Sequence, residues 1–224
     1  MIYDPTIFYS TYLDDYHKFK IITLKTLLDN ADRYENDFFE GGLTSDGKET
    51  YKKTLQADLR QTYFHAIETF FELFFHLNPI AKEFIGDENI MIALTHSNWR
   101  ESYKKIKEIA ENENALDYLD MEVNMVNFKV TVGHYLFYYG LSSTQKMDEK
   151  FEEKLTESLS AIKYGIRLIA KDFIDREEYN SYKHGLRIIP ALKEIAVADV
   201  KTMTPHIKWN LEDSMSFFVK TNTG

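Results

Sequence analysis

The chain has 224 residues, of which 44% are hydrophobic and 28% charged, and its formal net charge is −9 at pH 7. This composition is typical of a globular protein, and the 16 Phe and 15 Tyr exclude extended disorder. The absence of cysteine excludes disulfides, thiolate zinc sites, iron–sulfur clusters and a cysteine nucleophile. The acidic charge disfavours general binding to duplex nucleic acid, although a local basic patch could still bind one.

The N-terminal residues and the apolar segments argue against membrane association. The first residues have no basic start, no continuous apolar run and no small-residue cleavage site, so we do not expect a signal peptide. The most apolar stretch, residues 63–77, is interrupted by two histidines and two glutamates, which makes it too polar to span a bilayer. Together with the absence of cysteine, these features predict a cytoplasmic protein without membrane contact.

Two long helices are predicted in the first third of the chain. The first spans residues 4–36, because an aspartate suited to N-capping precedes Pro5, and proline is favoured at the first helical position. Glycines and polar residues predict a loop at residues 40–47. The second helix spans residues 49–77 and ends before Pro79, since the residue before a proline avoids the helical region.

The middle of the chain carries further helix signals. Asn98 and Glu101 have the spacing of a capping box, with Ser97 as the alternative cap, and Gly140 follows an apolar run as a C-terminal stop. A longer amphipathic pattern precedes residue 175. The corresponding helices are expected at residues 80–84, 98–111, 123–139 and 147–174.

The pattern changes after residue 185. Ile188 and Ile189 favour extended structure, and apolar residues alternate with polar ones in residues 206–220, around a turn at residues 212–214. We therefore expect an all-α fold: a multi-helix bundle with a small C-terminal β-hairpin. The bundle domain would occupy residues 1–187, and the extended segment and hairpin residues 188–224.

A polar line crosses the most apolar helix, residues 60–77, which is predicted to be the central helix of the bundle. Four of its members are of metal-binding type and lie three or four positions apart, so a helix places them on one face: His65, Glu68, Glu72 and His76. One interpretation is a face turned to solvent or to a polar contact between helices. The other is a set of ligands for iron, manganese or zinc, or of acid–base groups, in a metal-dependent helical-bundle enzyme.

A basic stripe is the second candidate site. If residues 176–187 are helical, one face carries four polar side chains: Arg176, Asn180, His184 and Arg187. Arginine binds phosphate in a bidentate manner, and histidine can transfer a proton near neutral pH. The alternative is structural: Lys183, His184 and Arg187 offset the negative end of a helix dipole.

The segment Asn180-Ser181-Tyr182-Lys183-His184-Gly185 resembles the Asn-x3-His-Gly motif of the HEPN superfamily of helical-bundle proteins. Active members of that superfamily are metal-independent ribonucleases of defence or stress systems, and their Arg and His act on RNA at a dimer interface. The resemblance implies catalytic roles for His184 and Asn180, and no cofactor. From the stripe itself we expect Arg187 to act with them, and Arg176, Lys183 and Tyr179 to bind the ligand. Tyr179 stands where active members carry arginine. A second interpretation is therefore a degenerate relative that only binds RNA, a nucleotide or a protein.

Self-association is the last expectation. Tyrosine is favoured at interfaces, because it buries area while its hydroxyl stays solvated, and Tyr179 and Tyr182 flank the basic stripe. The HEPN resemblance likewise implies a two-fold dimer. We therefore expect a homodimer with residues 176–187 near its interface, the alternative being that these tyrosines cover the core of the monomer. A non-catalytic interaction module is the third functional class that the sequence leaves open.

Overall fold

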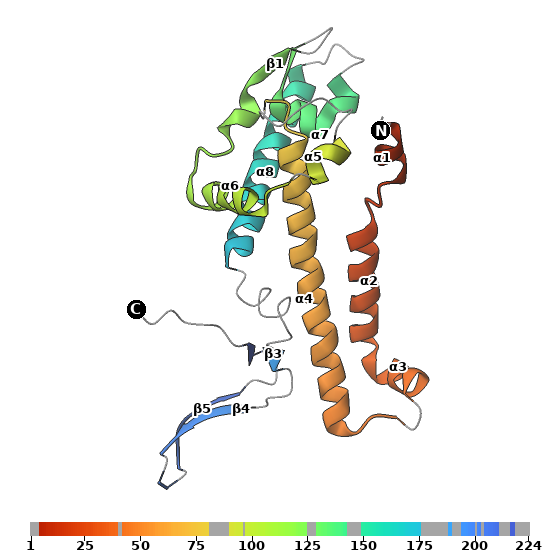
Figure 1. The fold of residues 1–224 in the computed structure, drawn as a ribbon, viewed down its shortest axis with the longest axis vertical. Helices are drawn as coiled ribbons and strands as arrows, with labels where there is room; N and C mark the ends of the chain where they lie inside the picture. The colour runs from red at the N-terminus through yellow and green to blue at the C-terminus, as the bar shows by residue number, and fades with distance from the viewer. Residues whose placement is uncertain are drawn as a thin grey trace. The chain divides into compact units, whose positions relative to one another are not determined.

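The computed structural model describes residues 5–39, 42–80, 90–95, 97–124, 129–142, 149–175, 188–189, 194–199, 201–202, 204–210 and 216–217 (Figure 1). This part of the chain is mainly α-helical with small antiparallel sheets, so the all-α class with a C-terminal β-hairpin is confirmed. The helices are α1 (Pro5–Thr11), α2 (Tyr16–Asp29), α3 (Ala31–Phe38), α4 (Ser45–His76), α5 (Ile90–Thr95), α6 (Trp99–Glu111), the 3-10 helix η2 (Asp117–Asp120), α7 (Val132–Ser142) and α8 (Glu149–Ile174). The strands are β1 (Glu122–Asn124), β2 (Lys129–Thr131), β3 (Ile188–Ile189), β4 (Glu194–Ala198), β5 (Pro205–Asn210) and β6 (Ser216–Phe217).

The chain divides into two compact units. The first unit comprises Met1–Leu13 and Ala66–Asp175, and the second comprises Asp14–His65 and Arg176–Gly224. Helix α4 contributes residues to both units, because the boundary falls inside it. The predicted domain boundary at residue 187 borders a segment outside the described residues, so it stays a prediction.

The first predicted helix, residues 4–36, is wrong as one continuous element, because the structure divides it into α1, α2 and α3. Before α2, the side chain of Asp14 accepts a hydrogen bond of 2.9 Å from the backbone N–H of Asp15. Between α2 and α3, the Asn30 side chain donates a hydrogen bond of 2.9 Å to the carbonyl of Thr26. Short polar side chains of this kind compete with the helical backbone for hydrogen bonds, which favours breaks at these positions.

Helix α4 begins before the predicted start at residue 49. The hydroxyl oxygen of Thr44 accepts a hydrogen bond of 3.2 Å from the backbone N–H of Gly47, which makes Thr44 an N-cap. The sequence from Ser45 to Gly47, predicted as loop, therefore forms the first helical turn. In the described part of the chain, no helix combines the length and the apolar character needed to cross a membrane.

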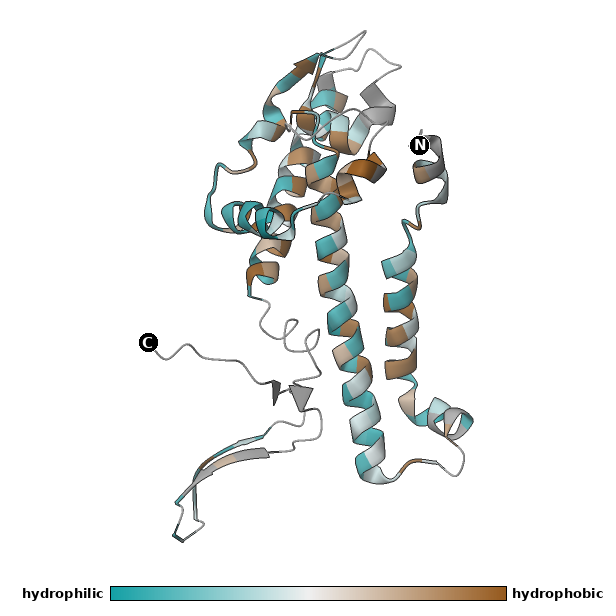
Figure 2. Cartoon of the chain, in the orientation of Figure 1, coloured by the Kyte–Doolittle hydropathy of each residue, from teal (hydrophilic) through white to brown (hydrophobic). Residues whose placement is uncertain are grey.

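The core of the first unit is built around the end of α4. Phe71 is fully buried, with its ring centroid 6.4 Å from that of Phe173 on α8. Phe74 stacks on Phe137 of α7 at 6.2 Å. Figure 2 shows the apolar residues of α4, α5, α7 and α8 in this unit. Within this unit, the structure confirms the predicted central position of the α4 phenylalanines. The other buried apolar residues of its helices α6 and α8 are Ile106, Ile109, Ala110, Leu155, Leu159, Ile166 and Ala170.

The helix predicted at residues 123–139 is wrong in its first part. Strands β1 and β2 pair antiparallel there, with Val123 opposite Val130, and α7 begins only at Val132. β-branched residues such as valine and threonine favour pleated strands over helices, which explains why strands form where helix was predicted. The helical regularity of α7 is interrupted just before Gly140, at Tyr138 with φ −136° and ψ 23°, and the helical segment after this kink extends to Ser142.

The C-terminal hairpin of the second unit uses a different partner strand from the predicted one. Strand β5 pairs antiparallel with β4, whereas the sequence pattern suggested pairing within residues 206–220. Ile195 lies opposite Trp209, and Val197 lies opposite Ile207, so apolar residues are paired across the two strands. Strand β6 pairs instead with β3, which confirms the extended structure expected at Ile188 and Ile189.

The turn between β4 and β5 explains this pairing. The carboxylate of Asp199 accepts hydrogen bonds from the backbone N–H groups of Lys201 at 2.8 Å and Thr202 at 3.0 Å. The backbone N–H of Asp199 also donates to the carbonyl of Thr204 at 3.1 Å. An aspartate that binds the backbone ahead of it is a strong local turn signal. The chain therefore reverses after β4, and β5 lies against β4.

Candidate functional site

The polar line on α4 is the first candidate site. Helix α4 is continuous over the four predicted metal ligands, so His65, Glu68, Glu72 and His76 follow one side of it, as the spacing predicts. Their surroundings differ: His65 is exposed, whereas Glu72 and His76 are partly buried. The four residues therefore belong to different surroundings: His65 lies in the second unit, and Glu68, Glu72 and His76 lie in the first.

In the first unit, Glu72 is tied to the segment before α6. The hydroxyl of Ser97 donates a short hydrogen bond to Oε2 of Glu72. Nδ1 of His76 lies 2.7 Å from the carbonyl oxygen of Glu72 and 3.7 Å from its Oε2. Because a carbonyl oxygen only accepts hydrogen bonds, Nδ1 of His76 carries the proton. In the neutral ring, Nε2 is then the acceptor and the basic atom.

A small polar pocket of about 70 Å³ adjoins this cluster. A water molecule occupies about 30 Å³ in the liquid, so the pocket has room for roughly two waters or one small ion. Nδ2 of Asn98 donates to Oε1 of Glu101 at 3.3 Å, and Nζ of Lys105 lies 5.4 Å from the ring centroid of Phe75. The described lining residues are Phe75, His76, Ser97, Asn98, Glu101, Ser102 and Lys105.

The metal hypothesis gains no support from this geometry. Across the described ranges, no three His, Asp or Glu side chains gather so that they could hold a metal ion. The Glu72 carboxylate already accepts a hydrogen bond from Ser97, and the His76 Nδ1 proton is donated to a carbonyl. Three of the predicted ligands have other contacts: His65 with His17 of α2, Glu72 with Ser97, and His76 with the carbonyl of Glu72.

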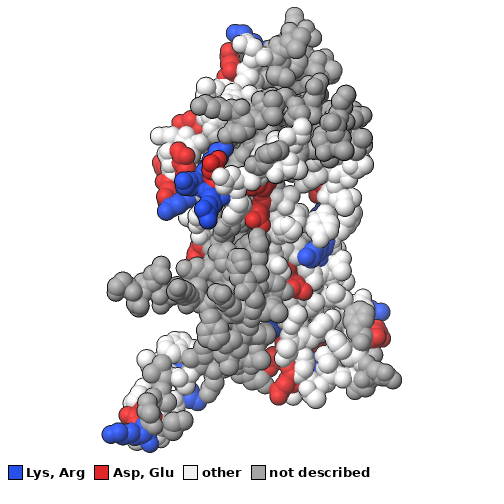
Figure 3. Space-filling view, in the orientation of Figure 1, with Lys and Arg blue, Asp and Glu red and all other residues white. Residues whose placement is uncertain are grey.

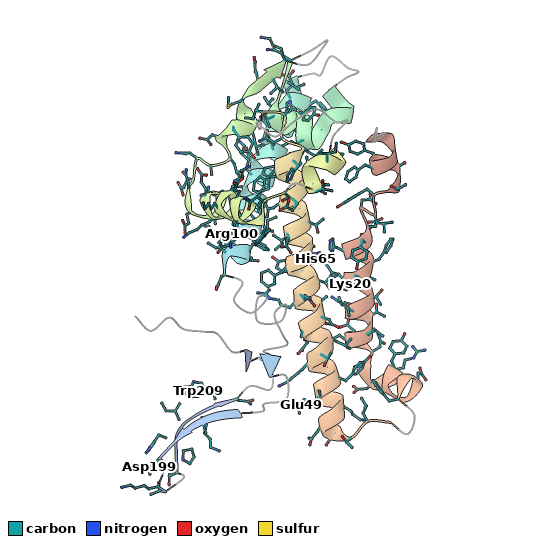
Figure 4. The ribbon with its side chains drawn as sticks, viewed as in Figure 1. Lys20, Glu49, His65, Arg100, Asp199 and Trp209 are labelled. Carbon is teal, nitrogen blue, oxygen red and sulfur yellow. The ribbon has the colours of Figure 1, made fainter. Side chains whose placement is uncertain are left out.

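In the second unit, His65 lies against His17 of α2. Their ring centroids are 5.0 Å apart, with the rings nearly perpendicular at 78°. Burial lowers the pKa of His17, and the nearby His65 and Lys20 lower it further, because positive neighbours oppose a second positive charge. Figure 4 labels Lys20 on α2 and His65 on α4. The sequence pattern does not point to His17, because its histidine neighbour comes only from the packing of α2 against α4.

Helix α6 presents a basic face in the first unit. Arg100, Lys104 and Lys107 are exposed and follow one another at helical spacing, on the side away from the buried Ser102 and Ile106, with the exposed Glu111 at the end of the same face. Figure 3 shows Lys and Arg side chains gathered over α6, and Figure 4 labels Arg100 there. Asn98 caps this helix, because its side chain accepts a hydrogen bond of 3.1 Å from the N–H of Arg100. Asn98 is therefore the N-cap of α6, and its side chain, rather than its backbone N–H, bonds the carboxylate of Glu101.

The basic stripe of the HEPN-like motif lies outside the described residues, so its arrangement stays a prediction. This applies to all six residues named for it: Arg176, Tyr179, Asn180, Lys183, His184 and Arg187. The described site residues that the sequence pattern did not indicate include Ser97 and Lys105 at the pocket, His17 on α2, and the α6 cations Arg100, Lys104 and Lys107. The capping signal at Ser97 and Asn98 was the sequence feature that pointed to the small pocket beside Glu72 and His76.

Comparison of the chain with protein-family models, with curated proteins and with solved structures gives no match.

Proposed function

We propose that this chain is a HEPN-like protein that binds RNA or a nucleotide through its phosphate groups. The observation that carries the proposal is the exposed basic face of α6, formed by Arg100, Lys104 and Lys107 in a chain of net charge −9. A local cluster of cations attracts phosphate even when the whole protein is acidic, because charges beyond about 10 Å are screened at physiological salt. The motif at residues 180–185 supports the same ligand class by its resemblance to HEPN proteins.

The residue types on α6 suit a phosphate backbone. The planar guanidinium of Arg100 can donate two parallel hydrogen bonds to one phosphate, while Lys104 acts as a mobile point charge. Lys107 lies 3.7 Å from Glu111, but an exposed pair of this kind is weak and yields to a stronger anion. Single-stranded RNA is the favoured macromolecule, since its separated phosphates and bases can follow a short helix face. Such a role fits a cytoplasmic protein.

We expect binding without cleavage. Tyr179 occupies the position of the arginine found in active HEPN ribonucleases, so the degenerate form of that site is proposed. His184 would then contribute to phosphate binding through its imidazole. A cleavage assay in EDTA, with wild type and His184→Ala compared on the same RNA, separates the two forms. Cleavage that disappears in His184→Ala would assign a metal-independent ribonuclease and overturn the binding-only version.

The α6 face is tested by charge reversal. Arg100→Glu with Lys104→Glu and Lys107→Glu should weaken binding of a short labelled RNA at least roughly tenfold and flatten its salt dependence, because fewer counterions are released. The matched control reverses three exposed lysines of α8 in the same unit: Lys150, Lys154 and Lys171. Anisotropy titrations at several salt concentrations give both quantities. An equal loss of RNA affinity in the two triple variants would mean that net charge alone accounts for the change. No binding of RNA by the wild type would refute the proposal.

The proposal includes a homodimer with residues 176–187 near its two-fold axis. A two-fold contact needs a self-complementary patch, which Tyr179 and Tyr182 with their charged neighbours would supply. Light scattering at micromolar concentration measures the mass. A monomer would refute the dimer, and a dimer that persists in Tyr179→Asp with Tyr182→Asp would place the interface elsewhere.

A further inference from the structure

Two opposite charges of α6 line the small polar pocket beside His76 without pairing with each other. Glu101 and Lys105 both belong to its lining, and they lie four positions apart on the helix. Glutamate followed by lysine at this spacing is the order that favours an ion pair on a helix surface. Across the described residues, however, neither side chain takes part in an ion pair. Both charges are therefore available to a ligand of the pocket.

The next pair on the same helix shows that this spacing does allow pairing. Nζ of Lys107 lies 3.7 Å from Oε1 of Glu111, although lysine before glutamate is the less favourable order. That pair follows the exposed side of α6, where no pocket intervenes. The separation of Glu101 from Lys105 is thus a local property of the pocket and not of the helix as a whole.

Each of the two charges has a contact of its own at the pocket. Nδ2 of Asn98 donates a hydrogen bond of 3.3 Å to Oε1 of Glu101. Nζ of Lys105 lies 5.4 Å from the ring centroid of Phe75, which is buried. An amide and an aromatic ring are weak partners for full charges, because neither carries a compensating charge. A ligand that brings such charges would form the stronger interactions.

Ser102 adds a buried hydroxyl to the same pocket. The residue is 6% exposed and follows Glu101 directly in the sequence. Its backbone N–H donates to the carbonyl of Asn98 at 3.0 Å, but among the described residues its hydroxyl has no hydrogen-bond partner. A buried polar group without a partner costs free energy. A hydroxyl can donate to an anionic group, so a carboxylate in the pocket would satisfy it.

We propose that this pocket binds a small α-amino acid as its zwitterion. The ammonium group would donate to the carboxylate of Glu101, and the carboxylate would accept hydrogen bonds from Lys105 and from the Ser102 hydroxyl. A ligand of one charge leaves one of the two side chains without a partner, whereas a zwitterion pairs with both. The pocket of about 70 Å³ has room for roughly two waters, so each charged group replaces about one of them. Glycine and alanine are the expected ligands, because little space remains for a side chain.

This site is separate from the α6 face proposed for RNA. The pocket takes helix positions 98, 101, 102 and 105, and the cations of the proposed RNA face take positions 100, 104 and 107. Residues at these spacings lie on different sides of a helix. The carboxylate of Glu101 would also repel a phosphate inside the pocket. The amino-acid site is therefore independent of RNA binding.

The test titrates the full chain with glycine and alanine, and with acetate and methylammonium as the two halves of the zwitterion. Titration calorimetry at pH 7 and low salt gives the affinities. We expect saturable binding of one glycine per chain. Acetate and methylammonium should each bind at least roughly tenfold more weakly, because each lacks one of the two charged groups and its hydrogen bonds.

Two variants assign the contacts. Glu101→Gln should reduce glycine to the affinity of acetate without weakening acetate, and Lys105→Gln should reduce glycine to the affinity of methylammonium without weakening methylammonium. Glu108→Gln on α6 and Lys154→Gln on α8 remove the same charges at exposed positions outside the pocket, and should leave glycine binding unchanged. Thermal unfolding followed by circular dichroism confirms that each variant is folded, so a loss of binding is not a loss of structure.

Three outcomes would overturn the inference. No binding of glycine or alanine at millimolar concentrations would remove the amino-acid ligand. Acetate that binds as tightly as glycine would assign a plain anion site, and methylammonium that does so would assign a plain cation site. Glycine binding that survives both Glu101→Gln and Lys105→Gln would place the ligand elsewhere on the chain.

Discussion

The hydroxyl of Ser97 donates a hydrogen bond to the carboxylate of Glu72, which lies 25 positions earlier on α4. The bond ties the segment that caps α6 to the central helix of the first unit. Both groups are partly buried, so a lost partner is not fully replaced by water. The same oxygen, Oε2, lies 3.7 Å from Nδ1 of His76, so a serine and a histidine both approach it.

Removing one partner of this bond should destabilise the first unit. Ser97→Ala leaves the Glu72 carboxylate with one donor fewer, and we expect a loss of about 1–3 kcal/mol in the free energy of unfolding. Urea unfolding of Ser97→Ala, Glu72→Gln and the double variant gives a coupling energy, expected to be at least about 0.5 kcal/mol. Ser160→Ala removes a hydroxyl that donates to Thr156 on the exposed side of α8, and should change stability by less than about 0.5 kcal/mol. Additive single effects would show that the bond contributes no stability.

Two glycines in helices should respond oppositely to alanine. A Cβ at Gly133 of α7 would lie 2.7 Å from both methyl carbons of Leu159 and 3.1 Å from the carbonyl of Leu119, so something must move. We expect Gly133→Ala to cost about 1–3 kcal/mol through overpacking. A Cβ at Gly165 of α8 meets nothing within 4 Å, so Gly165→Ala should stabilise by about 0.5–1 kcal/mol, since alanine is the better helix former.

The contact with Leu159 can be tested directly. If the Cβ of residue 133 strains that side chain, then Gly133→Ala combined with Leu159→Ala should cost less than the sum of the single changes. Thermal unfolding by circular dichroism measures all variants. A stabilising Gly133→Ala, or strictly additive effects with Leu159→Ala, would contradict the crowding argument.

Replacing a buried phenylalanine of α4 by alanine should destabilise the protein more than replacing an exposed phenylalanine does. Phe71 is fully buried against Phe173, and Phe71→Ala should cost about 3–5 kcal/mol, because it loses both burial and packing. Phe151 of α8 is 39% exposed, and Phe151→Ala should cost less than about 1 kcal/mol. Chemical denaturation of the two variants measures the difference. Equal costs would indicate that Phe71 is not central to the core of this unit.

Periodicity predicted the helical class and the helices α4, α6 and α8, because their apolar residues repeat at helical spacing, whereas the first predicted helix is divided into three. Asn98 is the clearest case, since its capping interaction depends only on neighbours in sequence. The pairing of β5 with β4 could not be predicted in the same way. The apolar residues of β5 could pair equally well with those of β4 or with those later in residues 206–220. The turn at Asp199 selects β4 as the partner of β5, because the Asp199 carboxylate accepts hydrogen bonds from the backbone N–H groups that follow it.

The candidate site was less predictable than the fold. The spacing of His65 and Glu72 correctly placed them on one side of α4, but spacing contains no information about the residue that faces them. Ser97 and His17 supply those partners from other segments. Residue types suited to metal binding are equally suited to contacts between helices, and the choice depends on whether the groups converge. In the described part of the chain they do not.

The last prediction concerns acid stability and depends on His17. Its pKa is lowered from the ordinary value of 6.5 by burial, by His65 and by Lys20. The unfolded chain therefore takes up a proton at this residue at a higher pH than the folded chain does. Folding stability rises with pH wherever the unfolded state binds more protons, so acidification below about 6.5 should destabilise the protein until the folded pKa is passed.

Removing the imidazole or its charged neighbours should change this dependence in defined directions. His17→Gln should flatten the loss of stability below pH 6.5, and Lys20→Gln should raise the pKa of His17, because one repelling charge is gone. Urea unfolding at several pH values measures the first effect, and imidazole proton resonances measured by NMR against pH give the second. His206→Gln, on an exposed position of β5, is the control and should leave the slope unchanged. A pKa of His17 above 6.5, or an unaltered slope in His17→Gln, would mean that α2 and α4 do not hold the two imidazoles together in solution.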